Sequence, residues 1–262
     1  QKVDLVLLEV GIGGLLDTTN VVTGEIAIIT SIGLDHQETL GDSLTAIAEQ
    51  KAGIFKPGNS AVIANLAPES QLVCQRTAND LGVTLYQANK DFSFRNGNFS
   101  SSLADFNHLI LGLEGAYQEE NAALALQAFL LFMAQRNEKV DQEAVRAALQ
   151  ATKWAGRLEA ITEHIYLDGA HNLPALERLV EFIQEKIQQG YQPQILFGAL
   201  KRKDYSGMLA YLTEHLPDAD LYVTSFDYQG SLGEQDLSGY RIVSSYQEFI
   251  DTFEASAGEK DL

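Results

Sequence analysis

Acidic and basic side chains accompany two apolar segments near the start of the sequence. Glu9 lies near the end of the apolar run 3–10, and Asp35 and His36 end the next apolar run. Carboxylate oxygens are the ligands that Mg²⁺ prefers, and a histidine nitrogen can join them at sites of phosphate chemistry. A histidine at a strand end is also commonly a hydrogen-bonded structural residue. The sequence therefore leaves two interpretations of His36 open, a metal ligand and a structural residue.

Three glycines follow Glu9, at positions 11, 13 and 14. Glycine at a strand exit lets the backbone approach a phosphate, which is how dinucleotide-binding proteins use it. Their pattern is broken here, because Leu16 stands where a third small residue is required. The Glu9 carboxylate would also repel a pyrophosphate unless a cation lay between them. A tight turn is the alternative explanation of the glycines.

Lys51 is a further candidate, because its position in a helical pattern is unusual for a lysine. Within the expected helix 42–52, positions 44, 47, 48 and 51 share one face, and the other three residues on that face are apolar. A lysine there either extends its ammonium to water or has a neutral amine that can react. The spacing is consistent with both interpretations.

Two motifs in the second half carry the remaining candidates. Arg157 lies in W-A-G-R-L-E at 154–159, near an expected domain junction, where its guanidinium either binds a phosphate or forms an interdomain ion pair. Asp168 and His171 lie in D-G-A-H-N, between an apolar segment and a helix that begins near Pro174. Polar groups at a strand end beside a helix N-terminus are typical of a ligand site.

Alternating strand and helix patterns must position these side chains. Runs of leucine and β-branched residues predict strands buried in a parallel sheet. Strands are expected at 3–10, 25–33, 61–64, 83–87, 163–167, 194–200 and 220–225, and helices at 42–52, 68–81, 119–135, 141–150, 174–188, 204–215 and 246–255. The pair Asn96-Gly97 predicts a hairpin turn, and Asp42 and Asp141 are expected helix N-caps. Cys74 is expected to be a buried helix residue.

The composition limits the kinds of partner. The 262 residues include 18 Lys and Arg against 36 Asp and Glu, a net charge of −18, and 45% are hydrophobic. This excess of acid argues against nucleic acid and anionic membranes, because both bind through clustered cations. No stretch approaches the roughly 18 apolar residues of a membrane span, and a single cysteine excludes an internal disulfide. We expect a cytoplasmic monomer.

Several longer motifs, taken in order, resemble folylpolyglutamate synthase, with or without dihydrofolate synthase activity, of the Mur ligase superfamily. The matching segments are LLEVGIGGLLDTTNVV, ITSIGLDHQETLGDSLTAIAEQKAGIFKPG, YQEENAALAL, WAGRLE, YLDGAHN and FGALKRKDYSGML. The resemblance implies an α/β fold in two parts. Residues 1–153 would form part of the central ATPase domain, a mostly parallel sheet with helices and a small β-hairpin region, and residues 154–262 a Rossmann-like C-terminal ligase domain.

The resemblance also implies an activity and roles for individual residues. The protein would use ATP and Mg²⁺ to add L-glutamate to a folate or dihydropteroate carboxylate through an acyl phosphate. Glu9, His36 and a carbamylated Lys51 would bind magnesium. Asn121, Arg157 and Asp168 would contact ATP. Arg157 would also stabilise the transferred phosphoryl group, and His171 would lie near the incoming glutamate or that group.

The sequence departs from the family at four places. The glycine-lysine-serine phosphate loop expected before Glu9 and the closing strand expected after Leu262 are not in the 262 residues, Leu15 replaces an arginine and Ala155 a proline. We therefore expect a fragment that is inactive by itself. The alternatives are a peptidoglycan-type amino acid ligase of the same superfamily and a non-catalytic nucleotide-binding module.

Overall fold

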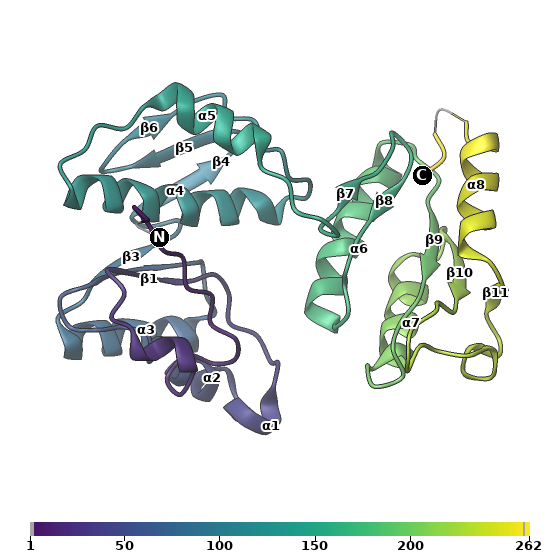
Figure 1. Cartoon of the computed structure of the whole chain (residues 1–262), viewed down its shortest axis with the longest axis horizontal. Coiled ribbons are helices and arrows are strands. Elements are labelled where there is room, and N and C mark those ends of the chain that lie inside the picture. Colours follow the sequence, from purple (N-terminus) through teal and green to yellow (C-terminus); the bar gives the residue numbers. More distant parts are fainter. Residues whose placement is uncertain (1–2, 259) are drawn as a thin grey trace. The chain divides into compact units, whose positions relative to one another are not determined.

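The structure is a computed structural model that describes residues 3–258 and 260–262. Contacts within the chain divide it into two units. The first contains residues 1–112 and 117–152, and the second contains residues 113–116 and 153–262 (Figure 1). Each unit has its own sheets and helices. No helix among the described residues has the length and apolar character needed to cross a membrane.

A three-stranded parallel sheet organises the first unit, with the order β1-β2-β3. The strands are β1 (Ile26–Ile29), β2 (Ser60–Ile63) and β3 (Thr84–Gln87), and the helices that connect them are α1 (Gln37–Leu40), α2 (Leu44–Ala52) and α3 (Pro68–Leu81). The predicted strands at 25–33 and 83–87 are thus confirmed in shorter form, the strand at 61–64 is confirmed one residue earlier, and helix 68–81 is confirmed to the residue. Cys74 is buried in α3, as expected, and burial raises the pKa of its thiol to about 11.

The predicted strand 3–10 is wrong. Residues 3–10 have no strand conformation, and their large side chains are exposed, with Leu7 84% accessible. Among the described residues, β1 has a partner strand on one edge only, which is β2. A strand needs a ladder of backbone hydrogen bonds as well as apolar side chains. Residues 3–10 have the composition of a buried strand without that ladder.

An antiparallel sheet and two further helices complete the first unit. The sheet contains β4 (Phe92–Arg95), β5 (Asn98–Ser101) and β6 (Asp105–Phe106), and the helices are α4 (Tyr117–Gln135) and α5 (Gln142–Ala151). The hairpin at Asn96-Gly97 is confirmed, with φ of 50° and 73°. Asp141 caps α5 as predicted, because its carboxylate accepts from the amides of Glu143 and Ala144. Helix α4 packs against β4 as well as β1 and β2, and lies between the two sheets (Figure 1).

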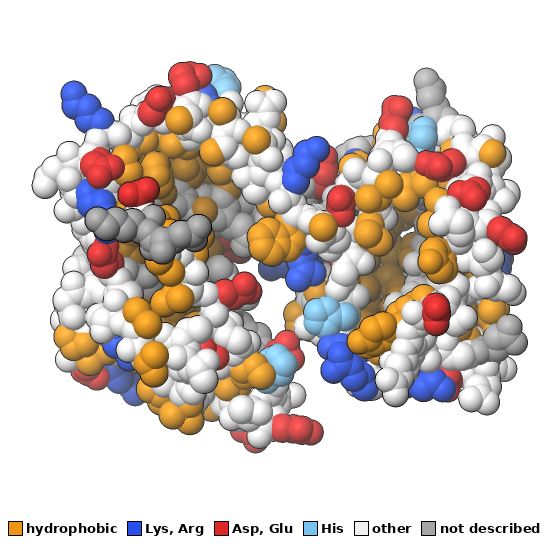
Figure 2. Space-filling view, viewed as in Figure 1, with side chains coloured by type: hydrophobic (Ala, Val, Ile, Leu, Met, Phe, Trp, Pro, Cys, Tyr) orange, Lys and Arg blue, Asp and Glu red, His pale blue; other side chains and the backbone are white. Residues whose placement is uncertain are grey.

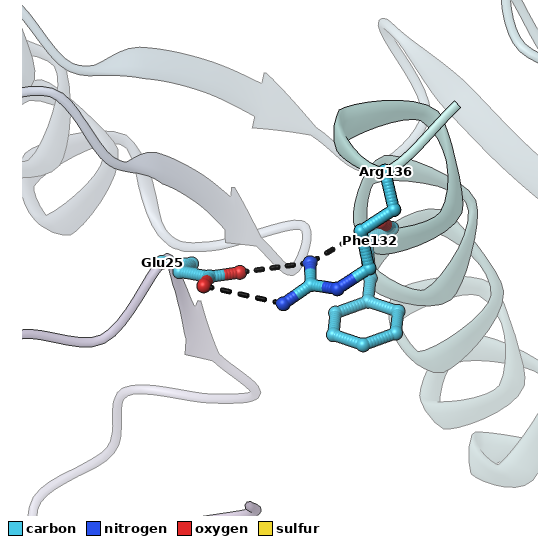
Figure 3. Close-up of polar contacts among 3 residues, drawn as sticks. All are labelled: Glu25, Phe132 and Arg136. Carbon is cyan, nitrogen blue, oxygen red and sulfur yellow. Dashed lines mark hydrogen bonds and ion pairs between the residues drawn. The ribbon is translucent and has the colours of Figure 1, made fainter. Parts of the chain in front are cut away.

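An ion pair joins the parallel sheet to the end of α4. Arg136 donates to both carboxylate oxygens of Glu25, over 2.9 and 3.2 Å, and to the carbonyl of Phe132 over 3.5 Å (Figure 3). The guanidinium also stacks on the Phe132 ring, 3.7 Å from its centroid. The fork and the ring together fix the guanidinium plane.

The second unit has a parallel sheet in the order β11-β10-β9. Its strands are β9 (Gln194–Phe197), β10 (Asp220–Thr224) and β11 (Arg241–Val243), and its helices are α6 (Leu173–Gln188), α7 (Tyr205–His215) and α8 (Tyr246–Ser256). A short antiparallel pair, β7 (Glu159–Ala160) and β8 (Tyr166–Leu167), precedes α6. The α/β class is confirmed in both units, whereas α1, β7, β11 and the 3-10 helices η1 (Thr18–Val21) and η2 (Glu234–Leu237) were not predicted.

Candidate functional site

The glycine-rich loop after Glu9 is held by one carboxylate. Asp17 Oδ2 accepts from the amides of Gly11 and Ile12, over 3.0 and 3.2 Å. Asp17 Oδ1 accepts from the Thr19 hydroxyl over 2.6 Å and from the Thr19 amide over 2.9 Å. These donors, the Thr19 hydroxyl first, lower the pKa of Asp17 to about 2. Asp17 is therefore an ionised cap that fixes both ends of the loop.

The loop packs closely on the C-terminal end of α2. A Cβ atom on Gly14 would lie 2.8 Å from the Gln50 carbonyl oxygen, and one on Gly53 would lie 2.4 Å from the Leu15 Cβ. The Leu15 amide donates to the Gln50 carbonyl over 2.7 Å. Close packing of the two backbones thus explains why glycine is needed at positions 14 and 53. For Gly14, this supports the tight-turn explanation.

Lys51 lies in the last turn of α2, beside this contact. Ile47 and Ala48 on the same face are buried, whereas Lys51 is half-buried. The cap of α2 is Ser43, whose hydroxyl accepts from Ala46, so the expected Asp42 cap is wrong by one residue. Within the described parts of the chain, the Lys51 ammonium has no hydrogen-bond or ion-pair partner.

Glu9 and His36 are exposed, and both are donor types that suit Mg²⁺. His36 has a left-handed backbone, with φ of 51°, and its amide donates to Asp35 Oδ1 over 2.8 Å. The His36 ring nitrogen Nε2 lies 4.0 Å from Asp35 Oδ2. Among the side chains that the structure describes, no group of three or more His, Cys, Asp or Glu could hold a metal. The metal ligands proposed from the sequence thus stay a prediction.

Asn121 lies on the exposed side of the first turns of α4. Its amide donates to Gln118 Oε1 over 2.9 Å. The neighbouring Glu119 accepts from both amides of the Asn96-Gly97 turn, each over 3.3 Å. The carboxylate of Glu119, two residues before Asn121, thus holds the hairpin to α4.

In the second unit, two motifs meet. Asp168 Oδ2 accepts from the Leu158 amide and Asp168 Oδ1 from the Ala170 amide, each over 2.8 Å. The Gly169 amide donates to the Gly156 carbonyl, also over 2.8 Å. These bonds bring W-A-G-R-L-E and D-G-A-H-N side by side. The resemblance implies that Asp168 contacts ATP, whereas in the structure both of its carboxylate oxygens accept from backbone amides.

Arg157 and His171 are exposed at this junction. A Cβ on Gly169 would lie 3.5 Å from Arg157 Nη1, which places the guanidinium against D-G-A-H-N. His171 Nδ1 lies 2.9 Å from the Gly169 carbonyl, so Nδ1 carries the proton and Nε2 is left as an acceptor in the neutral ring. Asn172 caps α6 by accepting from Ala175 over 3.0 Å. The guanidinium thus lies against a motif that leads into the N-terminus of a 16-residue helix, and a guanidinium and a helix N-terminus both favour an anion.

The sequence of the first unit matches one family model. The model of the Mur ligase middle domain matches residues 1–138, more than half of the chain. The chain belongs to the Mur ligase family.

Similarity to known Mur ligases extends through both units. The chain is 34% identical over 253 residues to the dihydrofolate synthase/folylpolyglutamate synthase of Bacillus subtilis, covering 90% of this chain and 57% of the relative. Among solved structures, the apo form of L. casei FPGS has a TM-score of 0.78 at 28% identity, over 97% of this chain and 61% of that chain. The bifunctional enzyme of Yersinia pestis, complexed with AMPPNP and Mn ion, has a TM-score of 0.77 at 29% identity, over 99% and 62%. The chain thus spans somewhat over half the length of these relatives.

The residues predicted for this Mur ligase chain fall into separate groups. Arg157, Asp168 and His171 lie together in the second unit, and Arg157 has no ion-pair partner among the residues that the structure describes. Asn121 lies on α4 of the first unit, where the loop after Glu9 packs beside Lys51. Sequence reasoning missed Asp17 and its neighbour Asn20. The signal was present in D-T-T-N, because aspartate before threonine is typical of a side-chain cap.

Proposed function

We propose that this Mur ligase chain is part of an ATP-dependent ligase that adds L-glutamate to a folate carboxylate, with dihydropteroate as a second acceptor to be tested. The observation that carries the proposal is the extent of the similarity. It continues past the middle domain through residues 153–262, where Arg157 lies against the D-G-A-H-N motif that contains His171. The relative from Bacillus subtilis is named for both activities. Residues 1–153 and 154–262 are proposed as its central and C-terminal domains.

In the first unit, we assign the metal site to Glu9, His36 and Lys51. The Lys51 amine would attack CO₂, forming an N–C bond and releasing a proton, and the resulting carbamate is an anion. Mg²⁺ bound there would neutralise charge on the ATP phosphates and the transferring phosphoryl group. The unpaired, half-buried amine of Lys51 supports this assignment, and the exposed Glu9 and His36 leave their donor atoms accessible.

In the second unit, Arg157 would bind the phosphoryl group through its guanidinium fork. Asp168 would hold the Arg157 loop in place, while Asn121 of the first unit, Arg157 and Asp168 are proposed as ATP-binding by resemblance. In the neutral tautomer whose Nδ1 donates to Gly169, His171 Nε2 would accept a proton from the attacking glutamate amine. ATP, the folate carboxylate and glutamate are all negatively charged, so cations such as Arg157 are needed to hold them together in the site.

The acidic surface supports small-molecule substrates over nucleic acid. Figure 2 shows acidic side chains spread over the visible face, between exposed hydrophobic ones. The net charge is −18. A protein that binds nucleic acid is instead expected to have Lys and Arg clustered on one face. We propose a monomeric enzyme in the cytoplasm.

The test uses the full-length protein and labelled L-glutamate. With ATP and Mg²⁺, we expect glutamate to be transferred to tetrahydrofolate, dihydropteroate or both, with one ADP released for each bond formed. Arg157→Ala and His171→Ala should each lower kcat at least about 100-fold. The matched control is Arg178→Ala on α6, an exposed arginine that pairs with Glu181, which should keep wild-type kcat. Transfer to a peptidoglycan precursor with none to folates would overturn the proposal.

A further inference from the structure

The side chain of Asn20 joins the glycine-rich loop to the end of α2. Its Nδ2 donates to the Leu15 carbonyl over 2.9 Å and to the Gly53 carbonyl over 3.1 Å. Both partners are carbonyl oxygens, so only the NH₂ group of the amide can face them. One amide thus uses its two protons on two segments, one five residues before Asn20 and the other 33 residues after it.

The backbone of Asn20 is itself fixed. Its amide donates to the Asp17 carbonyl over 3.0 Å, and the Asp17 amide donates to Gly14 over 3.2 Å. Asp17 in turn holds Gly11 and Thr19, as described above. The donor group of Asn20 is therefore presented from a rigid turn and loses little entropy when it binds the two carbonyls.

The end of α2 that Asn20 holds includes Lys51. The Leu15 amide binds the carbonyl of Gln50, just before Lys51, and Asn20 binds the carbonyl of Gly53, two residues after it. A Cβ on Gly14 would lie 3.1 Å from the carbonyl oxygen of Lys51 itself. The loop thus contacts the backbone before, at and after this lysine.

We propose that Asn20 is a positioning residue that fixes Lys51 relative to the glycine-rich loop, and through it the orientation of the Lys51 side chain for carbamate formation and metal binding. This proposal rests on the proposed function for the role of Lys51. Asn20 touches neither substrate nor metal in this scheme. It acts by setting the backbone from which the Lys51 side chain extends.

The experiment replaces the donor of Asn20 by an acceptor of the same shape. Asn20→Asp in the full-length protein places a carboxylate against two carbonyl oxygens, and Asn20→Ala removes the donor without adding charge. The matched control is Asn79→Asp on the exposed side of α3. Three quantities are measured: kcat with KM for ATP, the ¹³C-carbamate NMR signal in labelled bicarbonate, and amide hydrogen exchange of residues 11–20 and 50–54.

For Asn20→Asp we expect kcat to fall at least tenfold, KM for ATP to change less than about twofold, and the carbamate signal to weaken. Asn20→Ala should show the same changes at smaller size, and Asn79→Asp none of them. Exchange should rise in both segments of Asn20→Asp. If the aspartate variant does not fold, the alanine variant and its exchange decide. Wild-type kcat, carbamate signal and exchange in a folded Asn20 variant would overturn the proposal.

Failure of the proposed function gives a different result. If the wild-type protein ligates no glutamate and binds no CO₂, the ligase proposal fails. The exchange experiment still reports whether Asn20 holds the two segments together. If the wild-type protein is active and the Asn20 variants match it, the positioning role alone is refuted.

Discussion

Gly53→Ala tests whether the glycine-rich loop packs on α2 as closely as the structure has it. Gly53 has φ of −60° and ψ of −11°, a helical conformation that any residue adopts. A glycine is therefore not required there by its dihedral angles. An added Cβ would instead lie 2.4 Å from the Leu15 Cβ, 2.6 Å from its Cα and 2.8 Å from its Cδ1.

The cost follows from these contacts. Neither the Cα nor the Cβ of Leu15 can move without its backbone, which hydrogen bonds from Leu15 to Gln50 and from Asn20 to Leu15 hold in place. Forcing extra volume into a packed contact costs about 1–3 kcal/mol. Replacing glycine by alanine recovers about 0.4–1 kcal/mol by restricting the unfolded chain. Since the clash involves main-chain atoms, we expect a net loss of about 2 kcal/mol.

Thermal and urea unfolding followed by circular dichroism measure this loss. For a unit of this size, about 2 kcal/mol corresponds to a fall in Tm of about 4–8 °C. The control is Gly33→Ala, because nothing lies within 4 Å of a Cβ at Gly33, and it should leave Tm unchanged or slightly raised. Equal stability of Gly53→Ala and wild type would show that the loop does not pack on α2 in this way.

Three further changes test other contacts. A double-mutant cycle on Glu25→Gln and Arg136→Lys in urea should give a coupling of about 0.5–1 kcal/mol for the fork in Figure 3, and zero coupling would contradict it. Gln127 is 0% exposed, and neither side-chain amide atom has a partner among the described residues. Gln127→Leu should therefore raise the free energy of unfolding by about 1 kcal/mol, measured as a higher urea midpoint, and a lower midpoint would refute this. Asp17 has a folded pKa of about 2 against 3.8 unfolded. Its stabilisation is therefore present above pH 4 and lost as the pH falls toward 2, and Tm scans of Asp17→Asn should be flatter than wild type over that range.

Much of the fold can be predicted from residues that are neighbours in the sequence. Helix 68–81 was predicted to the residue because Pro68 suits its first turn and Gly82, with φ of 65°, ends it. The Asn96-Gly97 hairpin needs two residues with positive φ, which this pair readily adopts. In each case, the residues that determine the structure lie within the element or next to it.

Elements that depend on distant partners were predicted less well. Residues 3–10 have the composition of a buried strand, but the ladder that would make them one is not a property of their own sequence. Strand β11 was missed for the converse reason. Its residues, Arg241–Val243, are three in number and mostly exposed, and only pairing with β10 makes them a strand.

The candidate site shows how a chain with a net charge of −18 can be suited to an anion. Asp168 lies in one of the two facing motifs, and as an ion-pair partner it would neutralise the guanidinium of Arg157. Its two oxygens instead accept from the amides of Leu158 and Ala170. Hydrogen bonds from the backbone thus satisfy the carboxylate, and the Arg157 charge stays available. The sequence predicts Asp168 and Arg157 as site residues in two separate motifs. Only the fold shows that the Asp168 carboxylate holds the loop from which the Arg157 side chain extends.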